Sequence, residues 1–119
     1  MRRVASIVAL VLIGAALVGT PANADAATKK VGVFDDFFAP EDVKIHKGDS
    51  VKWVWDEFSV EDHNVTLKRG PAGVRKFHSK DQHYPTADPY KHRFKKRGEY
   101  RLWCTLHPQS MKMTVTVKR

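Results

Sequence analysis

The chain has 119 residues, with 21 lysines and arginines against 13 aspartates and glutamates, and it contains one cysteine. This length allows one domain, and a single cysteine excludes a disulfide within the chain. The formal net charge of +8 comes without a recognised nucleic-acid motif, so we expect no role in nucleic-acid binding.

The N-terminal 24 residues have the pattern of a secretory signal peptide. Two arginines precede an apolar run over residues 4–18, and Pro21-Ala-Asn-Ala24 ends in small residues. We predict cleavage after Ala24, with Ala26 as a nearby alternative. The apolar run is shorter than the about 20 residues that span a bilayer, so an uncleaved membrane anchor is the weaker alternative. The sequence therefore predicts an exported protein, either periplasmic or extracellular at the cell envelope.

Residues 25–119 form one predicted domain, built from short runs rich in Val, Phe, Trp, Tyr and Thr between Gly, Pro and Asp. The run Asp42-Val-Lys-Ile-His46 alternates polar and apolar residues, which is typical of a half-buried strand. The sequence has no sustained helical period and no internal repeat. The predicted strands cover residues 30–34, 42–46, 50–55, 63–67, 90–95, 99–104 and 114–117, with 112 as an alternative start of the last one.

Residues 70–88, between two of these strands, are polar and hold two prolines and two glycines. We expect an irregular excursion there, with a short helix or an edge strand. Seven or eight short strands with regular turns predict an all-β fold, an antiparallel β-sandwich of Greek-key type.

Cys104 is followed at close spacing by His107 and Met111. A second histidine, His63, lies far upstream. Thiolate and thioether ligands favour soft metals, imidazole suits copper, and two histidines with one cysteine and a weak axial methionine make the blue-copper arrangement. Cys104 ends a predicted strand, which anchors its backbone, and Pro108 restricts the loop that carries His107. These four ligand types predict a site for one copper ion.

Each of these residues has a plainer interpretation when it is taken alone. An isolated His63 would be a polar loop residue, and Cys104 or Met111 would be a packed core residue. Only their combination, in its strand and turn context, favours the metal. Asn64 is expected to hydrogen-bond across to the Cys104 loop and tie the two ligand-bearing segments together.

Four segments carry a family resemblance: Phe38-Ala-Pro-Glu-Asp-Val43, Gly48-Asp49 before Val51-Lys-Trp53, His63-Asn64, and Gly98-Glu-Tyr-Arg-Leu-Trp-Cys104 with His107. In this order they resemble the cupredoxins, the blue-copper proteins of the plastocyanin, amicyanin and pseudoazurin group, and most of all the small bacterial members. The resemblance covers nearly all of residues 25–119. It implies that the copper ligands are His63, Cys104, His107 and Met111.

The resemblance also implies that the ring edge of His107 is the exit for the electron, within an apolar patch on the surface. Leu106 and Pro108 are the stronger candidates for that patch, and Phe38 and Pro40 are the weaker ones.

Two methionines compete for the axial position. In similar proteins the axial methionine lies four residues before the start of a Val-x-Val strand, which is the offset from Met111 to Val115. Met113 instead falls in register with Val115 and Val117 on one strand face, so we expect it in the core.

The other histidines and the tryptophans have structural interpretations. The tryptophans are expected in the core and the sheets, with Trp103 facing away from Cys104 by period-two alternation. A loose second metal site at His78 and His83 is the weaker alternative to exposure. The four histidines expected to be solvated are His46, His78, His83 and His92.

We therefore predict a monomeric electron shuttle that passes one electron between redox partner proteins through Cu(I) and Cu(II), without enzyme activity or a small-molecule substrate. The alternative is a copper-binding protein for trafficking or storage, without redox turnover. The basic stretch Lys91–Arg101 is interpreted either as a solvated hairpin face or as a surface that steers an acidic redox partner.

Overall fold

The computed structural model describes residues 26–119, so the predicted signal peptide lies outside the described residues. Within residues 26–119 there is no helix long and apolar enough to cross a membrane. The strands are β1 (Thr28–Phe34), β2 (Phe37–Ala39), β3 (Asp42–His46), β4 (Ser50–Trp55), β5 (Thr66–Arg69), β6 (Tyr90–Arg93), β7 (Gly98–Trp103) and β8 (Lys112–Lys118).

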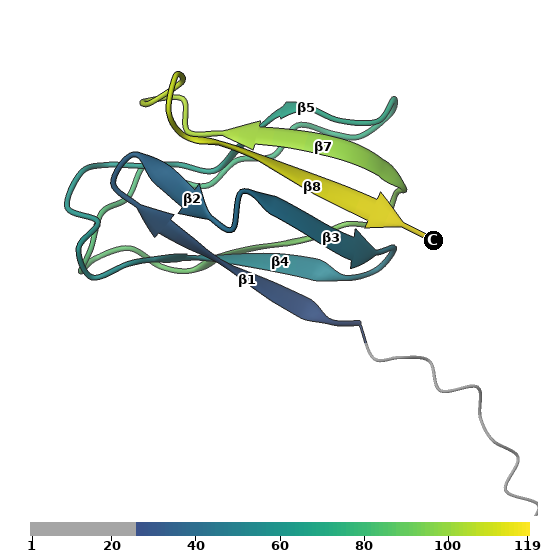
Figure 1. Ribbon diagram of the computed structural model, residues 1–119, viewed down its shortest axis with the longest axis horizontal. Coiled ribbons are helices and arrows are strands. Elements are labelled where there is room, and N and C mark those ends of the chain that lie inside the picture. Colours follow the sequence, from purple (N-terminus) through teal and green to yellow (C-terminus); the bar gives the residue numbers. More distant parts are fainter. Residues whose placement is uncertain (1–25) are drawn as a thin grey trace, which may run out of the picture.

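The strands form two four-stranded sheets, which pack against each other as a sandwich (Figure 1). The strand order is β2-β1-β4-β6 in one sheet and β3-β8-β7-β5 in the other. The predicted all-β sandwich is confirmed, but the sheets are mixed, because β1 pairs with β4 and β3 pairs with β8 in parallel. Period-two alternation reveals a strand without revealing the direction of its neighbour.

Two elements differ from the sequence prediction. The strand expected over residues 63–67 begins only at Thr66, because His63 makes an isolated bridge to Gln82 before the regular ladder starts. Strand β2 is not predicted, since its three residues are too few to show alternation. Residues 70–88 contain no helix. In place of the expected edge strand they make two isolated bridges, from His78 to Thr66 and from Gln82 to His63.

Alternate residues of the strands fill the core between the two sheets. Met113 is buried with Val115 and Val117 on one face of β8, as predicted. Trp53 is also buried, and its indole Nε1–H donates to Sδ of Met113 over 3.1 Å. Trp103 is half-buried on the outer face of its sheet, where Nζ of Lys68 lies 4.5 Å from the ring centroid. The expected alternation at Trp103 is therefore confirmed, and this side chain is not a core residue.

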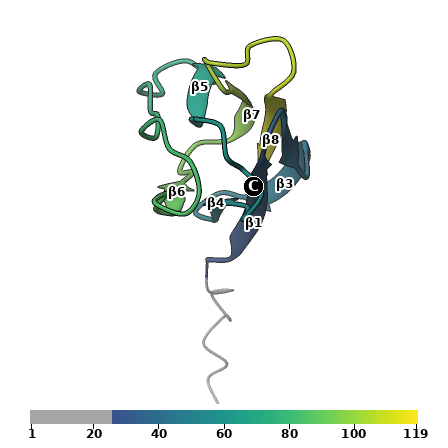
Figure 2. The same ribbon diagram turned by 90° about the vertical axis from the view of Figure 1, so that its left-hand side faces the viewer.

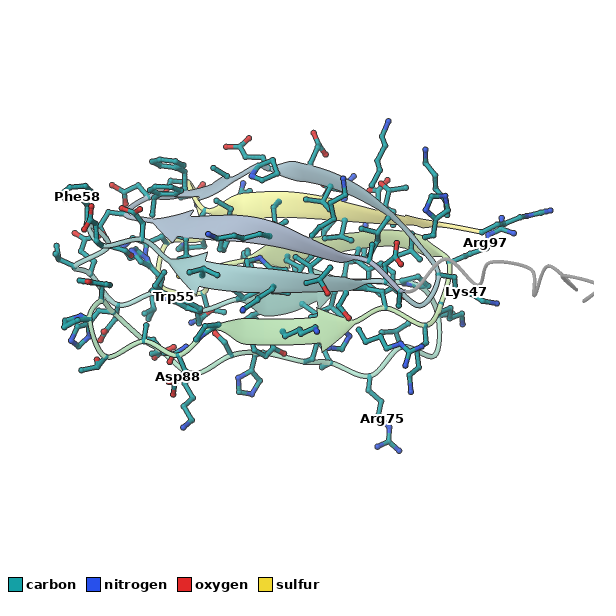
Figure 3. The ribbon with its side chains drawn as sticks, turned by 90° about the horizontal axis from the view of Figure 1, so that it is seen from below. Lys47, Trp55, Phe58, Arg75, Asp88 and Arg97 are labelled. Atoms are coloured by element: carbon teal, nitrogen blue, oxygen red, sulfur yellow. The ribbon has the colours of Figure 1, made fainter. Side chains whose placement is uncertain are left out.

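The sandwich has two distinct ends. Figure 2 looks onto the end where the connections after β1, β4 and β7 gather, which we call the loop end. Figure 3 places Phe58 at the loop end, and it places Lys47 and Arg97 at the opposite end. We call that opposite end the basic end, and it is lined by Lys47, Lys95, Lys96, Arg97, Lys118 and Arg119. The loop end consists of residues 35–36, 56–65 and 104–111.

Candidate metal centre

Three of the four predicted ligands meet at the loop end. Nδ1 of His63 lies 3.2 Å from Nδ1 of His107, and the same atom of His107 lies 3.6 Å from Sγ of Cys104. His63 and Cys104 are fully buried, and the side chain of His107 is 25% exposed. One donor atom from each of the three residues lies within 4.8 Å of the other two. The site is thus buried at His63 and Cys104 and partly open to solvent at His107.

The loop that presents His107 is held by its own backbone. The N–H of His107 donates to the carbonyl of Cys104 over 3.2 Å, and the N–H of Met111 donates to the carbonyl of His107 over 3.0 Å. The N–H of Cys104 donates to the carbonyl of Met111, also over 3.0 Å. Because Cys104 directly follows β7, these hydrogen bonds fix the loop against a strand of the core sheet. The fold therefore determines where the donor atoms of Cys104 and His107 lie.

Two carboxylates contact the outer nitrogens of the two imidazoles. Nε2 of His63 lies 2.7 Å from Oδ1 of Asp35, and Nε2 of His107 lies 3.3 Å from Oε2 of Glu61. An ionised carboxylate only accepts hydrogen bonds, so each contact favours a proton on Nε2 and leaves Nδ1 with a free lone pair. Both Nδ1 atoms therefore face the site as donors to a cation.

Asp35 is held in its ionised form. Burial raises the pKa of this carboxyl, but hydrogen bonds from His63 and from the backbone N–H groups of Glu61 and Val60 lower the pKa more, so it lies below its usual range. The carboxylate that orients His63 is therefore charged at neutral pH. Asp35 also connects the β1–β2 turn to the loop after β4.

The donor set fits one copper ion on two grounds. First, two unprotonated Nδ1 atoms at 3.2 Å would repel each other unless a proton or a cation lay between them. Second, ligand bonds of about 2.0–2.3 Å to one ion place neighbouring donor atoms about 3–4 Å apart. The observed separations of 3.2 and 3.6 Å lie in this range. Two imidazoles with a buried thiolate suit copper better than a hard cation.

Asn64 ties the two ligand-bearing segments together, as predicted. Its Oδ1 accepts from the backbone N–H of Thr105 over 3.1 Å, and its Nδ2 donates to Oγ1 of Thr105 over 2.7 Å. The backbone N–H of Asn64 points at Sγ of Cys104 over 3.4 Å. A donor aimed at the sulfur stabilises a thiolate, and the amide clasp fixes His63 relative to Cys104.

The two methionines have different surroundings. Met111 is fully buried in the loop between His107 and β8. Met113 lies in β8, where its sulfur accepts a hydrogen bond from Trp53. The structure thus gives Met113 a partner in the core and leaves the axial position to Met111 as a prediction.

Several surface predictions have mixed outcomes. Phe38 is only 1% exposed and cannot belong to a surface patch, because it packs into the core from β2. Leu106, Pro108 and Pro40 are exposed, as the patch requires.

His92 is not a solvated residue: its ring stacks on Phe77 with a centroid distance of 3.5 Å, and burial lowers its pKa.

His78 and His83 do not meet in a second metal site. Within residues 26–119, no group of three or more metal-binding side chains includes either of them. His83 is exposed, and its Nδ1 lies 2.7 Å from Oδ1 of Asp62. The Nδ1 of His78 is 2.8 Å from the carbonyl of Ser79, next to it in the chain.

Sequence analysis missed the two carboxylates, Asp35 and Glu61. The only signal for them was the position of Asp35 directly after Phe34 and of Glu61 two residues before His63. That signal is weak, because acidic residues in turns are common.

Residues 27–118 match the profile of a family described as copper-binding proteins of the plastocyanin/azurin family. No curated protein matches the sequence. Among solved structures, the chain is similar to an amicyanin from Paracoccus versutus, with a TM-score of 0.57 and 30% identity over 80% of this chain and 83% of that chain. It is similar to a pseudoazurin from Hyphomicrobium denitrificans, with a TM-score of 0.64 and 24% identity over 77% of this chain and 76% of that chain.

A larger enzyme contains a similar unit. The chain superimposes on a copper-containing nitrite reductase from Thermus scotoductus SA-01 with a TM-score of 0.65 and 23% identity. The match covers 77% of this chain but only 22% of that enzyme. This likeness concerns the fold, and most of the enzyme has no counterpart here.

Proposed function

The chain belongs to the plastocyanin/azurin family of copper-binding proteins, and from this premise we propose that it is a blue-copper electron carrier whose ligands are His63, Cys104, His107 and Met111. The observation that carries the ligand assignment is the convergence of three donor atoms within 4.8 Å from two separate loops. When bound, copper supplies one-electron exchange between its Cu(I) and Cu(II) states.

The residues around the site support this role by holding the donors in place. Asp35 orients His63, Asn64 joins the two loops, and the buried surroundings exclude water from Cys104. A ligand set that cannot rearrange easily suits electron transfer, because little reorganisation then accompanies the change of oxidation state. Copper trafficking or storage instead needs ligands that exchange the metal, and the burial of His63 and Cys104 opposes exchange.

The remaining functional assignments stay predictions. Export is supported by the N-terminal pattern of residues 1–24. Redox proteins are the expected partners, and the monomeric state is inferred from the sequence alone. We infer no enzyme activity, since the nitrite reductase is similar over only 22% of its own length.

Copper loading followed by spectroscopy and voltammetry tests the proposal. The Cu(II) protein should show an intense blue absorption band, and it should give a reversible one-electron couple. Cys104→Ser should abolish the band, because the thiolate is its source. A copper-loaded protein with the band but no reversible couple would point to storage.

A matched pair of histidine variants tests the ligand assignment. His107→Gln should lose the blue band, whereas His83→Gln should keep it, because His83 is exposed and belongs to no group of metal-binding side chains within residues 26–119. Equal loss in both variants would contradict the assigned ligand set.

A further inference from the structure

The exposed apolar side chains of the described residues gather at the loop end. Phe58 is 75% exposed, Val60 is 68% exposed and Leu106 is 47% exposed. Val60 and Leu106 each adjoin one partner of the contact between Glu61 and His107. The full set of exposed large apolar residues within residues 26–119 is Phe37, Phe58, Val60, Tyr84 and Leu106.

The other two members of this set lie beside the same loops. Phe37 begins β2 directly after the turn at residues 35–36, and the backbone N–H of Tyr84 donates to the carbonyl of Ser59. Scattered exposed apolar residues are ordinary, but a cluster confined to one end of a molecule marks an interaction surface.

The charge of the loop end is opposite to that of the whole chain. Residues 35–36, 56–65 and 104–111 contain no lysine or arginine. They contain six acidic residues, which are Asp35, Asp36, Asp56, Glu57, Glu61 and Asp62. The nearest part of the β5–β6 connection, residues 77–90, is not basic either, with one lysine and two aspartates. The loop end therefore combines exposed apolar side chains with acidic residues beside the partly exposed His107.

Six lysines and arginines line the basic end, whereas two others, Lys68 and Lys112, lie beside Trp103, next to the loop end. Strand β7 runs from Gly98 at the basic end to Trp103 beside Cys104. At about 3.4 Å per residue, Gly98 and Cys104 are about 20 Å apart. The Debye length is about 8–10 Å at physiological ionic strength. A partner at the loop end therefore experiences the acidic residues there, while the lysines and arginines of the basic end are largely screened.

We propose that the loop end docks a positively charged redox protein, with the apolar side chains at the centre of the interface and the acidic residues at its rim. This inference rests on the proposed electron-carrier function, since docking there brings the partner to His107. One electron passes from the reduced to the oxidised member of the pair, without transfer of atoms. An acidic partner would instead be drawn to residues 95–97, next to Gly98 and about 20 Å from Cys104, too far from the ligands for efficient electron tunnelling.

Reduction of the Cu(II) protein by small reagents measures the charge beside the site. Hexaammineruthenium(II), a cation, gives up one electron and becomes the ruthenium(III) complex, while Cu(II) becomes Cu(I). Between about 0.1 M and about 0.5 M ionic strength, its second-order rate should fall roughly threefold, as for attraction between opposite charges. A rate that stays flat or rises with salt would overturn the proposal, because that result is expected from the net positive charge.

Two variants with the same change of charge at opposite ends provide the control. Glu57 lies at the loop end and Glu99 lies at the basic end, and both are exposed. Glu57→Lys should lower the low-salt rate with the cation roughly twofold and flatten its salt dependence. Glu99→Lys should leave both within error of the unmodified protein. Equal effects of the two variants would mean that net charge, and not the acidic residues of the loop end, decides the rate.

Binding without electron transfer can be followed by NMR. The Cu(I) protein, titrated with a lysine-rich c-type cytochrome, should show amide shifts in residues 56–62 and 104–108 and none in residues 95–97. Shifts confined to the basic end would overturn the proposal. Absence of the blue band and of any reaction with the reagent would instead count against the electron-carrier function itself, so the two failures are distinguishable.

Discussion

At the loop end, the connections gather ligands, acidic residues and exposed apolar side chains, whereas at the basic end they gather lysines and arginines. The same strands run between the two ends. The loop end is held by side-chain hydrogen bonds between distant segments, such as that from Asn64 to Thr105. The basic end is held by backbone hydrogen bonds, such as that from Lys47 N–H to the Lys118 carbonyl, and by side-chain bonds such as that from Arg93 to the Gly48 carbonyl. Specialised chemistry is thus confined to one end, and the other can vary in charge without touching it.

The largest expected effect comes from removing the side-chain hydrogen bonds of Asn64 at the loop end. Asn64 makes four side-chain hydrogen bonds, to Asp81, Thr66 and twice to Thr105. Asn64→Ala should lower the free energy of unfolding by about 3 kcal/mol, because most of these four hydrogen bonds contribute about 1 kcal/mol each. Urea unfolding of the copper-free protein measures the loss. Retention of full stability would show that the clasp holds the ligands without holding the fold.

Tyr100→Phe is the counterpart at the basic end. The hydroxyl of Tyr100 donates one hydrogen bond, over 2.6 Å, to the carbonyl of Lys96. Its removal should cost about 1 kcal/mol in the same urea measurement and leave the blue absorption band unchanged. A change in the band would mean that the two ends are coupled through β7.

Two carboxylates that accept backbone hydrogen bonds sharpen the comparison. Asp35 also contacts His63, whereas Asp49 accepts only backbone N–H groups, from Ala27 and His46. Asp35→Asn should weaken Cu(II) binding about tenfold, because a neutral amide supports the ligating imidazole less well. If Cu(I) binding is unchanged, the reduction potential rises by about 60 mV, as voltammetry would show. Asp49→Asn should leave the potential unchanged, and an equal shift in both variants would remove the special role of Asp35.

The two methionines provide the third comparison. Met111→Leu should raise the reduction potential by roughly 30 mV, half of a tenfold step for one electron, since a thioether stabilises Cu(II) more than a hydrocarbon does. Met113→Leu should leave the potential unchanged and cost less than about 1.5 kcal/mol of stability, with loss of the hydrogen bond from Trp53. Voltammetry and urea unfolding of both variants separate the two roles. The reverse pattern would assign the axial position to Met113.

The smallest expected effect is a loss of stability in acid at the basic end. Backbone hydrogen bonds from His46 and Ala27 lower the pKa of Asp49 below its ordinary value. The unfolded chain, with an aspartate pKa of about 3.9, then binds more protons than the folded one. This contribution to stability is therefore complete above about pH 4 and is lost as the pH falls through the folded pKa. Asp49→Asn should show a smaller drop in its urea midpoint between pH 5 and pH 3, and an unchanged drop would contradict the assignment.

The strands and the pair Cys104 and His107 could be predicted from the sequence because both depend on short-range patterns, whereas the distant His63 was assigned through the family resemblance. The alternation of polar and apolar residues in Asp42–His46 predicts a half-buried strand, whichever elements cover its apolar face. The spacing of Cys104 and His107 places both donors on one loop, and the register of Met113 with Val115 places the thioether in the core.

Only the tertiary structure decided which distant segments meet. Asp35 and His63 are 28 residues apart, and no local pattern connects a turn after β1 to a loop after β4. The parallel pairing of β1 with β4 brings these two connections to the same end. It also places the basic stretch 91–101 with its turn at the far end of β7, although the same lysines and arginines could have faced the metal in another topology. Local sequence fixes what each segment can do, but chain topology fixes what lies beside it.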